Sequence, residues 1–364
     1  MNKKVSNIQI GMLLYLITSS MFLGVSDVIL LRKASNEVLI SMLLGTIIGI
    51  IPLLMYLKIN STYQNLNIFE KNKKLFGHIL GTLINILLIT MYMVFLSMAI
   101  RAVVIFLTSK YLENTSFFLI GLLILLTSLV ICYKGIITIS RISQISFVAC
   151  IILVIIIELF LIKYIEIDNI LPFFSSKNYI KNIIDGSIYH ASSCSLLSFL
   201  LLSIKKDKIK NNKKYNKTAI IFYLIASLSL TLVMFFIIGS FGYDMSTLFK
   251  YPEYILLKKI GLFNSELHLE NLLAFRWIFY MIALSNISLY GIIKGVNSFK
   301  INKKITNLII ITLGILCIIG AKTSGTIPKS LNTIKYYYLP YIALPIFIIF
   351  SIIFLKCLIT KKED

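Results

Sequence analysis

Two clusters of small hydroxyl residues interrupt long apolar runs of this chain. The first cluster, Thr18–Ser20, is followed by Gly24, and the second, Ser192–Ser195, follows Gly186. Short hydroxyl side chains compete for backbone hydrogen bonds and Gly weakens a helix, so both places are predicted to break a helix locally. A break exposes amide donors at one half-helix N-terminus and carbonyl acceptors at the end of the other half. Together these groups can hold a zwitterion such as an amino acid.

Two aromatic residues, Tyr92 and Phe275, are predicted as walls of the same site. For the aromatics the alternative interpretation is plain packing, and for the two hydroxyl clusters it is tight contact between membrane helices. Their occurrence in matching positions of two halves of the chain favours a binding site. The predicted ligand-binding residues are Thr18, Ser19, Ser20, Gly24, Tyr92, Ser192, Ser193, Cys194 and Phe275.

Charged residues also lie inside apolar runs: Arg101 and Glu158 are expected in the outer third of their helices, and Arg276 lies deeper. An ionised group in a membrane costs several kcal/mol unless it is paired or hydrated, so these three side chains should face the interior of a helix bundle. Two interpretations fit: a polar vestibule open to the outer side, or a charge-paired structural network. Three acidic residues nearer to the ends of runs can reach the lipid headgroups: Asp27, Asp185 and Glu270.

Catalysis is not indicated by any residue pattern. The five cysteines fall in or beside apolar runs without metal-ligand spacing, so they are predicted to be free packing thiols, and the three histidines are scattered. No Ser–His–Asp order, phosphate-binding loop or zinc-protease motif is present in the sequence. We expect a protein that is not an enzyme and that holds no metal and no cofactor.

Ten apolar runs must position all of these residues, and each is long enough, or nearly so, to cross a bilayer as a helix. Backbone amides cannot remain unpaired in lipid, so the fold class is predicted as an all-α polytopic membrane protein with ten transmembrane helices. The runs are Ile8–Leu31, Leu39–Leu57, Ile79–Leu107, Phe117–Tyr133, Ile142–Ile162, Gly186–Ile204, Thr218–Tyr243, Leu272–Ile293, Ile305–Ala321 and Tyr336–Leu355.

Five runs lie in each half of the chain, and an odd number of crossings gives the halves opposite orientations. We therefore predict a 5+5 inverted repeat with broken first and sixth helices, in which residues 1–175 and 176–358 are the repeats of a single membrane domain and 359–364 is a short tail. Most of the 36 Lys and Arg residues fall in alternate loops on the side of the N-terminus. The positive-inside rule then places both termini in the cytoplasm.

Two loops differ from the others. The segment Lys205–Lys217 carries seven lysines, and it is interpreted as a cytoplasmic anchor beside anionic lipid that can also touch a partner; nucleic acid is not an expected partner, because no recognition fold accompanies the charge. The segment Asp244–Glu270 contains a short amphipathic helical pattern on the outer side. It is either a lid over a vestibule or a connector on the membrane surface.

Several short motifs in this order resemble a known family. They are Tyr251-Pro252-Glu253-Tyr254 leading through His268-Leu269-Glu270 to Trp277, Gly135-Ile136 to Ser140-Arg141, and Asn169-Ile170-Leu171-Pro172. Together with the length and the ten runs, they resemble the B subunits of endospore germinant receptors, within the amino acid/polyamine/organocation transporter superfamily. Two positions depart from the family pattern: His268 replaces an Arg, and Ser192–Ser195 replaces a Gly-Glu pair.

The resemblance implies a small-molecule site at the broken helices 1 and 6. It also implies a complex with a larger A subunit and a C lipoprotein in the inner membrane of the spore, where the B subunit senses a small-molecule germinant, with an amino acid as the expected ligand. The alternative is an amino acid permease of the same superfamily, which moves its ligand across the membrane. Accumulation of labelled amino acid in vesicles would separate the two functions.

Overall fold

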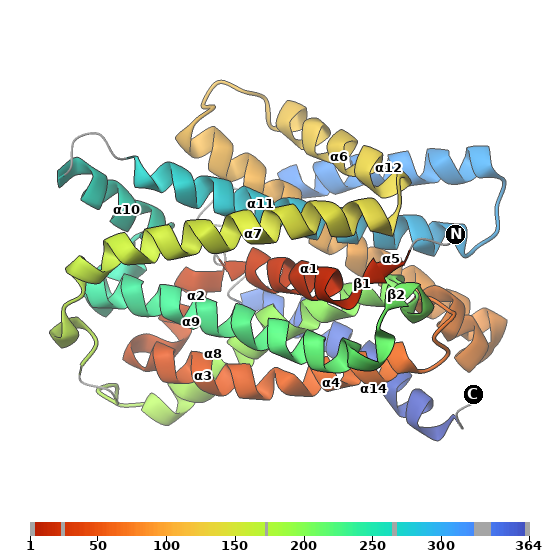
Figure 1. Cartoon of the computed structure of the whole chain (residues 1–364), viewed down its shortest axis with the longest axis horizontal. Helices are drawn as coiled ribbons and strands as arrows, with labels where there is room; N and C mark the ends of the chain where they lie inside the picture. Colours follow the sequence, from red (N-terminus) through yellow and green to blue (C-terminus); the bar gives the residue numbers. More distant parts are fainter. Residues whose placement is uncertain (1–3, 23–25, 172–173, 264–267, 324–335, 361–364) are drawn as a thin grey trace.

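The computed structural model describes residues 4–22, 26–171, 174–263, 268–323 and 336–360. Within these residues the chain is almost entirely helical, and its one sheet pairs the two-residue strands β1 (Val5–Ser6) and β2 (Ile209–Lys210) in parallel. Most helices run roughly along the long axis of the bundle. The strands and the end of helix α14 lie at one end, and helix α10 lies at the opposite end (Figure 1). The predicted all-α class is confirmed.

Thirteen α-helices are described, and some follow one another with little or no interruption. In chain order they are α1 (Asn7–Ser20), α2 (Asp27–Ala34), α3 (Val38–Ile48), α4 (Ile50–Ser61), α5 (Ile68–Lys110), α6 (Phe117–Tyr133), α7 (Ile136–Leu161), α8 (Tyr179–Ser195), α9 (Tyr215–Leu248), α10 (Pro252–Phe263), α11 (Leu269–Asn297), α12 (Lys303–Thr323) and α14 (Leu344–Ile359). A 3₁₀ helix, η5 (Leu196–Ser203), continues α8, and a π-helix, η8 (Tyr338–Ala343), leads into α14.

Seven helical stretches within the described residues are long and apolar enough to cross a membrane. They are Asp27–Ser61, Ile68–Lys110, Ile136–Tyr164, Tyr215–Leu248, Leu269–Asn297, Lys303–Thr323 and Tyr338–Ile359. Large aliphatic side chains on the outside of the bundle, such as Ile79 (77% exposed) and Ile145 (71%), form the apolar surface that lipid covers. The chain is therefore a multi-pass membrane protein. Helices α1, α6 and α8 are shorter, and the arrangement of ten spans stays a prediction.

Local sequence fixes where the helices begin and bend. Ser6 and Gln9 form a capping box at the start of α1, in which the side chain of each accepts a hydrogen bond from the backbone N–H of the other. Asn67 and Glu70 form the same arrangement at the start of α5. Gly77 divides α5 because its φ of 78° is open to glycine and disfavoured for other residues. The short segment before Gly77 can thus change direction from the long membrane helix that follows.

The centre of the bundle is built on α11, which packs against α1, α5, α6 and α7. Around it, α1 packs extensively on α9, and α3 packs extensively on α8. Buried side chains along α11, including Tyr280, Met281, Leu284 and Ile287, are at most 2% exposed. The two hydroxyl clusters, at the ends of α1 and α8, therefore lie in the interior beside α11 and its neighbours.

Candidate functional site

The first hydroxyl cluster occupies the last turn of α1. Thr18, Ser19 and Ser20 are at most 1% exposed, and Ser20 Oγ donates to the carbonyl of Ile17 at 2.7 Å. Among the described residues no hydrogen-bond partner reaches Thr18 Oγ1 or Ser19 Oγ. The α-helix ends at Ser20 and α2 begins at Asp27, while Gly24, the remaining predicted residue of this cluster, lies outside the described residues.

The second cluster occupies the last turn of α8, where the helix tightens into η5. Ser192 Oγ donates to the carbonyl of Tyr189 at 2.9 Å, and Ser193 Oγ donates to that of His190 at 3.1 Å, so both hydroxyls bond back to their own helix. The carbonyl of Ser192 accepts a hydrogen bond from Tyr338 of η8 at 3.2 Å. Cys194, beside them, is a buried free thiol, as are the other four cysteines.

The two predicted aromatic walls lie in different places. Tyr92 is buried, donates to the carbonyl of Leu200 in η5 at 2.9 Å, and packs so closely on Gly291 that a Cβ there would lie 2.2 Å from the Tyr92 ring. Phe275, by contrast, is 59% exposed on the outside of the bundle, so its assignment to the site was wrong. Successive helix residues are rotated by about 100°, and the buried positions Arg276 and Trp277 turn Phe275 outward.

Four polar groups that the sequence analysis did not single out share the properties of Thr18 and Ser19. Ser198 lies on η5, and Ser285, Asn286 and Ser288 lie on α11; all are at most 1% exposed, and each carries a side-chain oxygen without a hydrogen-bond partner in the described part of the chain. Helices α1, η5 and α11 pack on one another. We call Thr18, Ser19, Ser198, Ser285, Asn286 and Ser288 the central polar group. Three of them, Ser285, Asn286 and Ser288, lie within four positions of an apolar run, and this pattern in the sequence could have indicated them.

The charged residues are arranged differently from the predicted network of Arg101, Glu158 and Arg276. Arg276 donates from Nη2 to Glu253 Oε1 of α10 at 2.5 Å, and both side chains are at most 3% exposed. Glu158 lies within electrostatic range of Arg276, whereas Arg101 donates to the carbonyl of Ala321 at 2.6 Å. The acidic partner of Arg276 is thus Glu253, which the sequence analysis cited only as part of a motif.

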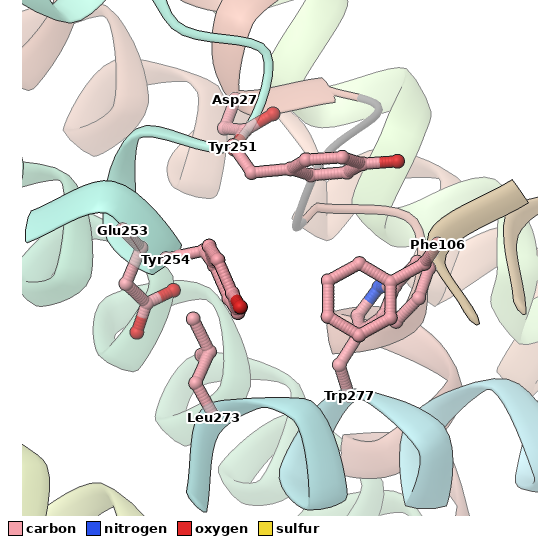
Figure 2. Close-up of a pocket in the computed structure, with 7 residues that line it drawn as sticks. All are labelled: Asp27, Phe106, Tyr251, Glu253, Tyr254, Leu273 and Trp277. Atoms are coloured by element: carbon pink, nitrogen blue, oxygen red, sulfur yellow. The ribbon is translucent and has the colours of Figure 1, made fainter. Parts of the chain in front are cut away.

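A small pocket, which we call the outer pocket, lies beside helix α10 at the end of the bundle opposite the strands (Figures 1 and 2), and its empty space of about 280 Å³ is partly open to solvent. The pocket is lined by Asp27, Phe106, Tyr251, Glu253, Tyr254, Leu273 and Trp277. The Phe106 ring centroid lies 4.8 Å from that of Trp277, 5.5 Å from Tyr251 and 5.8 Å from Tyr254. The segment that precedes α11 thus contributes Tyr251, Glu253 and Tyr254 to the wall of this pocket.

Two lysine ammonium groups already lie on these rings from outside the pocket. Lys110 Nζ is 5.1 Å from the Tyr254 ring centroid, and Lys250 Nζ is 4.5 Å from that of Tyr251. Burial, together with the nearby charges of Arg101 and Lys110, lowers the pKa of Lys250 to about 8. The outer pocket is thus a place where positive charge and aromatic faces meet, and where charge changes near physiological pH.

A comparison with known families now bears on these observations. The sequence model of the spore permease family, described as spore germination protein, matches residues 7–327, which include both hydroxyl clusters, α10 and α11. The chain belongs to the spore germination protein family. No curated protein matches it.

Family membership agrees with the architecture found here. The family model is named for a permease, and the described helices supply several apolar spans long enough to cross a membrane. The matched residues 7–327 end beyond α12, so the family pattern extends over every element that contributes to the central polar group and to the outer pocket.

Proposed function

We propose that this chain is the membrane subunit of a spore nutrient-germinant receptor and that it binds a small germinant, an amino acid, where α1 and α8 end. The observation that carries the proposal is the central polar group. Leaving a buried hydroxyl or amide oxygen unpaired costs about 1–3 kcal/mol. Six such residues on three helices that pack together are explained if a ligand supplies the missing hydrogen bonds.

Backbone groups at the ends of α1 and α8 also support the proposed site. Two backbone groups at the interruption of the first apolar run are bonded within the chain, since the carbonyl of Met21 accepts from the N–H of Ser26 and the N–H of Val28 donates to Asp27 Oδ1. The other carbonyls near Ser20 and the other amides that open α2 lie at the same interruption, and α8 changes into η5 after Ser195. In the proposed site these backbone groups take the carboxylate and ammonium of the ligand, while the hydroxyls of the central polar group fix its orientation. Tyr92 holds η5 in place through the carbonyl of Leu200.

The ten-helix inverted repeat with broken first and sixth helices is part of the proposal. In such a repeat α1 corresponds to α8, and α9 corresponds to α3. The contact of α1 with α9 then corresponds to the contact of α8 with α3, and both contacts are extensive. Each contact includes a glycine that leaves no room for a side chain: Gly11 against Phe222, and Gly186 against Ser41. This pairing is what two repeats of one fold require, and it supports the division at residue 175.

Signalling in this proposal runs through a change of state. The germinant shifts the bundle toward the state that it binds more tightly, and it can do so only by that difference in affinity. The partners are the germinant-receptor A subunit and the C lipoprotein in the inner membrane of the spore, with both termini of the chain on the cytoplasmic, core side. The outer pocket under α10 is then the entrance for the ligand.

Variants can locate the site. Replacing Ser20 or Ser193 with Leu should reduce the germinant response more than Glu270→Gln does. The two serines lie in the proposed site, at the ends of α1 and α8, whereas Glu270 lies outside it, in the first turn of α11. The response is measured as germination of spores that carry each variant, at equal protein level. Equal effects of the three substitutions would refute the placement.

The name of the matched family favours one second function, an amino acid permease. It uses the same site but alternates its access between the two sides of the membrane. Uptake of labelled amino acid by vesicles that contain only this chain would support transport. Loss of germination on deletion, with unchanged uptake by cells, would support the receptor.

A further inference from the structure

The β1–β2 pair forms a small, anchored platform at one end of the bundle (Figure 1). Val5 pairs with Ile209 and Ser6 with Lys210, and the side chains of Val5 and Ile209 are at most 3% exposed. The preceding turn is also tied down, because the N–H of Asp207 donates to the carbonyl of Gln64 at 3.1 Å and Lys205 forms an ion pair with Glu70 at 2.8 Å. The segment rich in lysine is therefore held in a defined position.

Four exposed lysines, Lys4, Lys210, Lys213 and Lys214, line a hollow on this platform together with Ile209 and Asn211. The empty space is about 810 Å³, and no carboxylate is among the residues that line it. Four ammonium groups held together by a folded backbone repel one another and attract an anion, most strongly at low ionic strength. We call these four lysines the basic platform.

The basic platform is connected to both helices of the proposed germinant site. Strand β1 leads directly into α1 at Asn7, and β2 follows η5 after a single 3₁₀ turn, Lys206–Lys208. A movement of α1 relative to η5 must therefore shift β1 against β2, which changes the distance of Lys4 from the other three lysines. The arrangement of positive charge thus depends on the state of the two helices.

We propose that the basic platform is a docking site for an extended acidic segment of a partner polypeptide, and that docking senses the relative position of α1 and η5. Charge complementarity identifies the partner's chemistry. The hollow is much larger than one phosphate, and several ammonium groups spread across it match several carboxylates along one chain. The sensing of α1 and η5 rests on the proposed function, whereas the docking of an acidic segment does not.

Poly-L-glutamate is the probe for the docking site. Its binding to the full chain in nanodiscs of zwitterionic phosphatidylcholine is followed by fluorescence anisotropy at two salt concentrations. The test variant changes Lys4, Lys210, Lys213 and Lys214 to Gln, and the matched control changes four other exposed lysines to Gln: Lys134, Lys300, Lys303 and Lys304. We expect the test variant to weaken binding at least tenfold, the control to weaken it less than threefold, and the wild-type affinity to fall with salt.

Three results would overturn the proposal. Equal weakening by the two quadruple variants would mean unspecific attraction to the total charge of the chain. Displacement of poly-L-glutamate by millimolar inorganic phosphate would indicate a site for a small anion, and displacement by phosphatidylglycerol in the nanodisc, at unchanged salt, would indicate a lipid site.

The coupling is tested separately, by the rate of disulfide cross-linking between Cys residues introduced at the paired positions Val5 and Ile209, which leave all four platform lysines in place, in a chain without its native cysteines. Poly-L-glutamate should change this rate at least threefold, and an unchanged rate would refute the coupling. Neither experiment contains a germinant, so failure here leaves the proposed germinant site untouched. Failure of germinant binding would likewise not refute the docking site.

Discussion

Removing the Glu253 carboxylate should destabilise the protein strongly, because Arg276 would be left charged and unpaired in the interior. The two groups are 2.5 Å apart and almost fully buried, and Arg276 Nε and Nη1 have no other partner in the described structure. Breaking a buried pair by removing one partner costs about 3–5 kcal/mol. For Glu253→Met, this loss corresponds to a fall in the unfolding temperature of roughly 10 °C by the conversion for globular domains.

The double variant provides the decisive comparison. Replacing Glu253 and Arg276 together with Met removes both charges, and such replacements of buried pairs are often neutral, so the double variant should be more stable than either single variant. Unfolding is followed by the fluorescence of Trp277, the sole tryptophan, which lines the pocket beside the pair. Lys258→Met, at an exposed position on the same helix, is the control. Equal destabilisation by the double variant and by the sum of the single variants would refute the reasoning.

Two further predictions concern the helices around the site. Gly291→Ala should destabilise the protein by about 1–3 kcal/mol and weaken the germinant response, because the new methyl group displaces Tyr92 from η5. The control is Gly320→Ala, whose Cβ would meet its nearest atom only at 3.8 Å and which should have neither effect. Similar unfolding temperatures for the two variants would contradict this prediction. Lys250 loses its proton at about pH 8 in the folded protein but near 10.5 when unfolded, so the unfolded state binds more protons between these values and stability should rise with pH there. Lys250→Gln should remove that rise, measured as unfolding temperature against pH, and an unchanged slope would count against the burial of Lys250.

The amino-acid sequence was sufficient for features that follow from solvation and chain order. Apolar runs too long for a soluble domain predict membrane helices, and the interruption near Thr18–Ser20 coincides with the end of α1. The change from α8 to η5 follows the second cluster directly, at Leu196. The broken first and sixth helices themselves stay a prediction.

Features that depend on which helix faces turn inward could not be predicted in the same way. Phe275 was assigned to the site because its residue type suits a pocket wall, but the rotation of α11 is fixed by Arg276, which must turn inward to meet Glu253. The partner of Arg276 comes from α10, 23 positions away in the sequence, and no periodicity connects the two. Ser198 could not be predicted, because it becomes significant only when η5 packs on α11.

Equilibrium binding to the variant Ser198→Ala tests the central claim most directly. Removing an unpartnered buried hydroxyl should leave the ligand-free protein at least as stable as the wild type, yet weaken binding of the germinant about tenfold, or about 1.4 kcal/mol. A panel of amino acids, nucleosides and sugars is screened by thermal stabilisation of the purified protein, and the strongest ligand is titrated against both proteins. The predicted result is stabilisation by an amino acid, with about ten times more of it needed for the same stabilisation of the variant. An affinity that is unchanged in Ser198→Ala would contradict the proposed site.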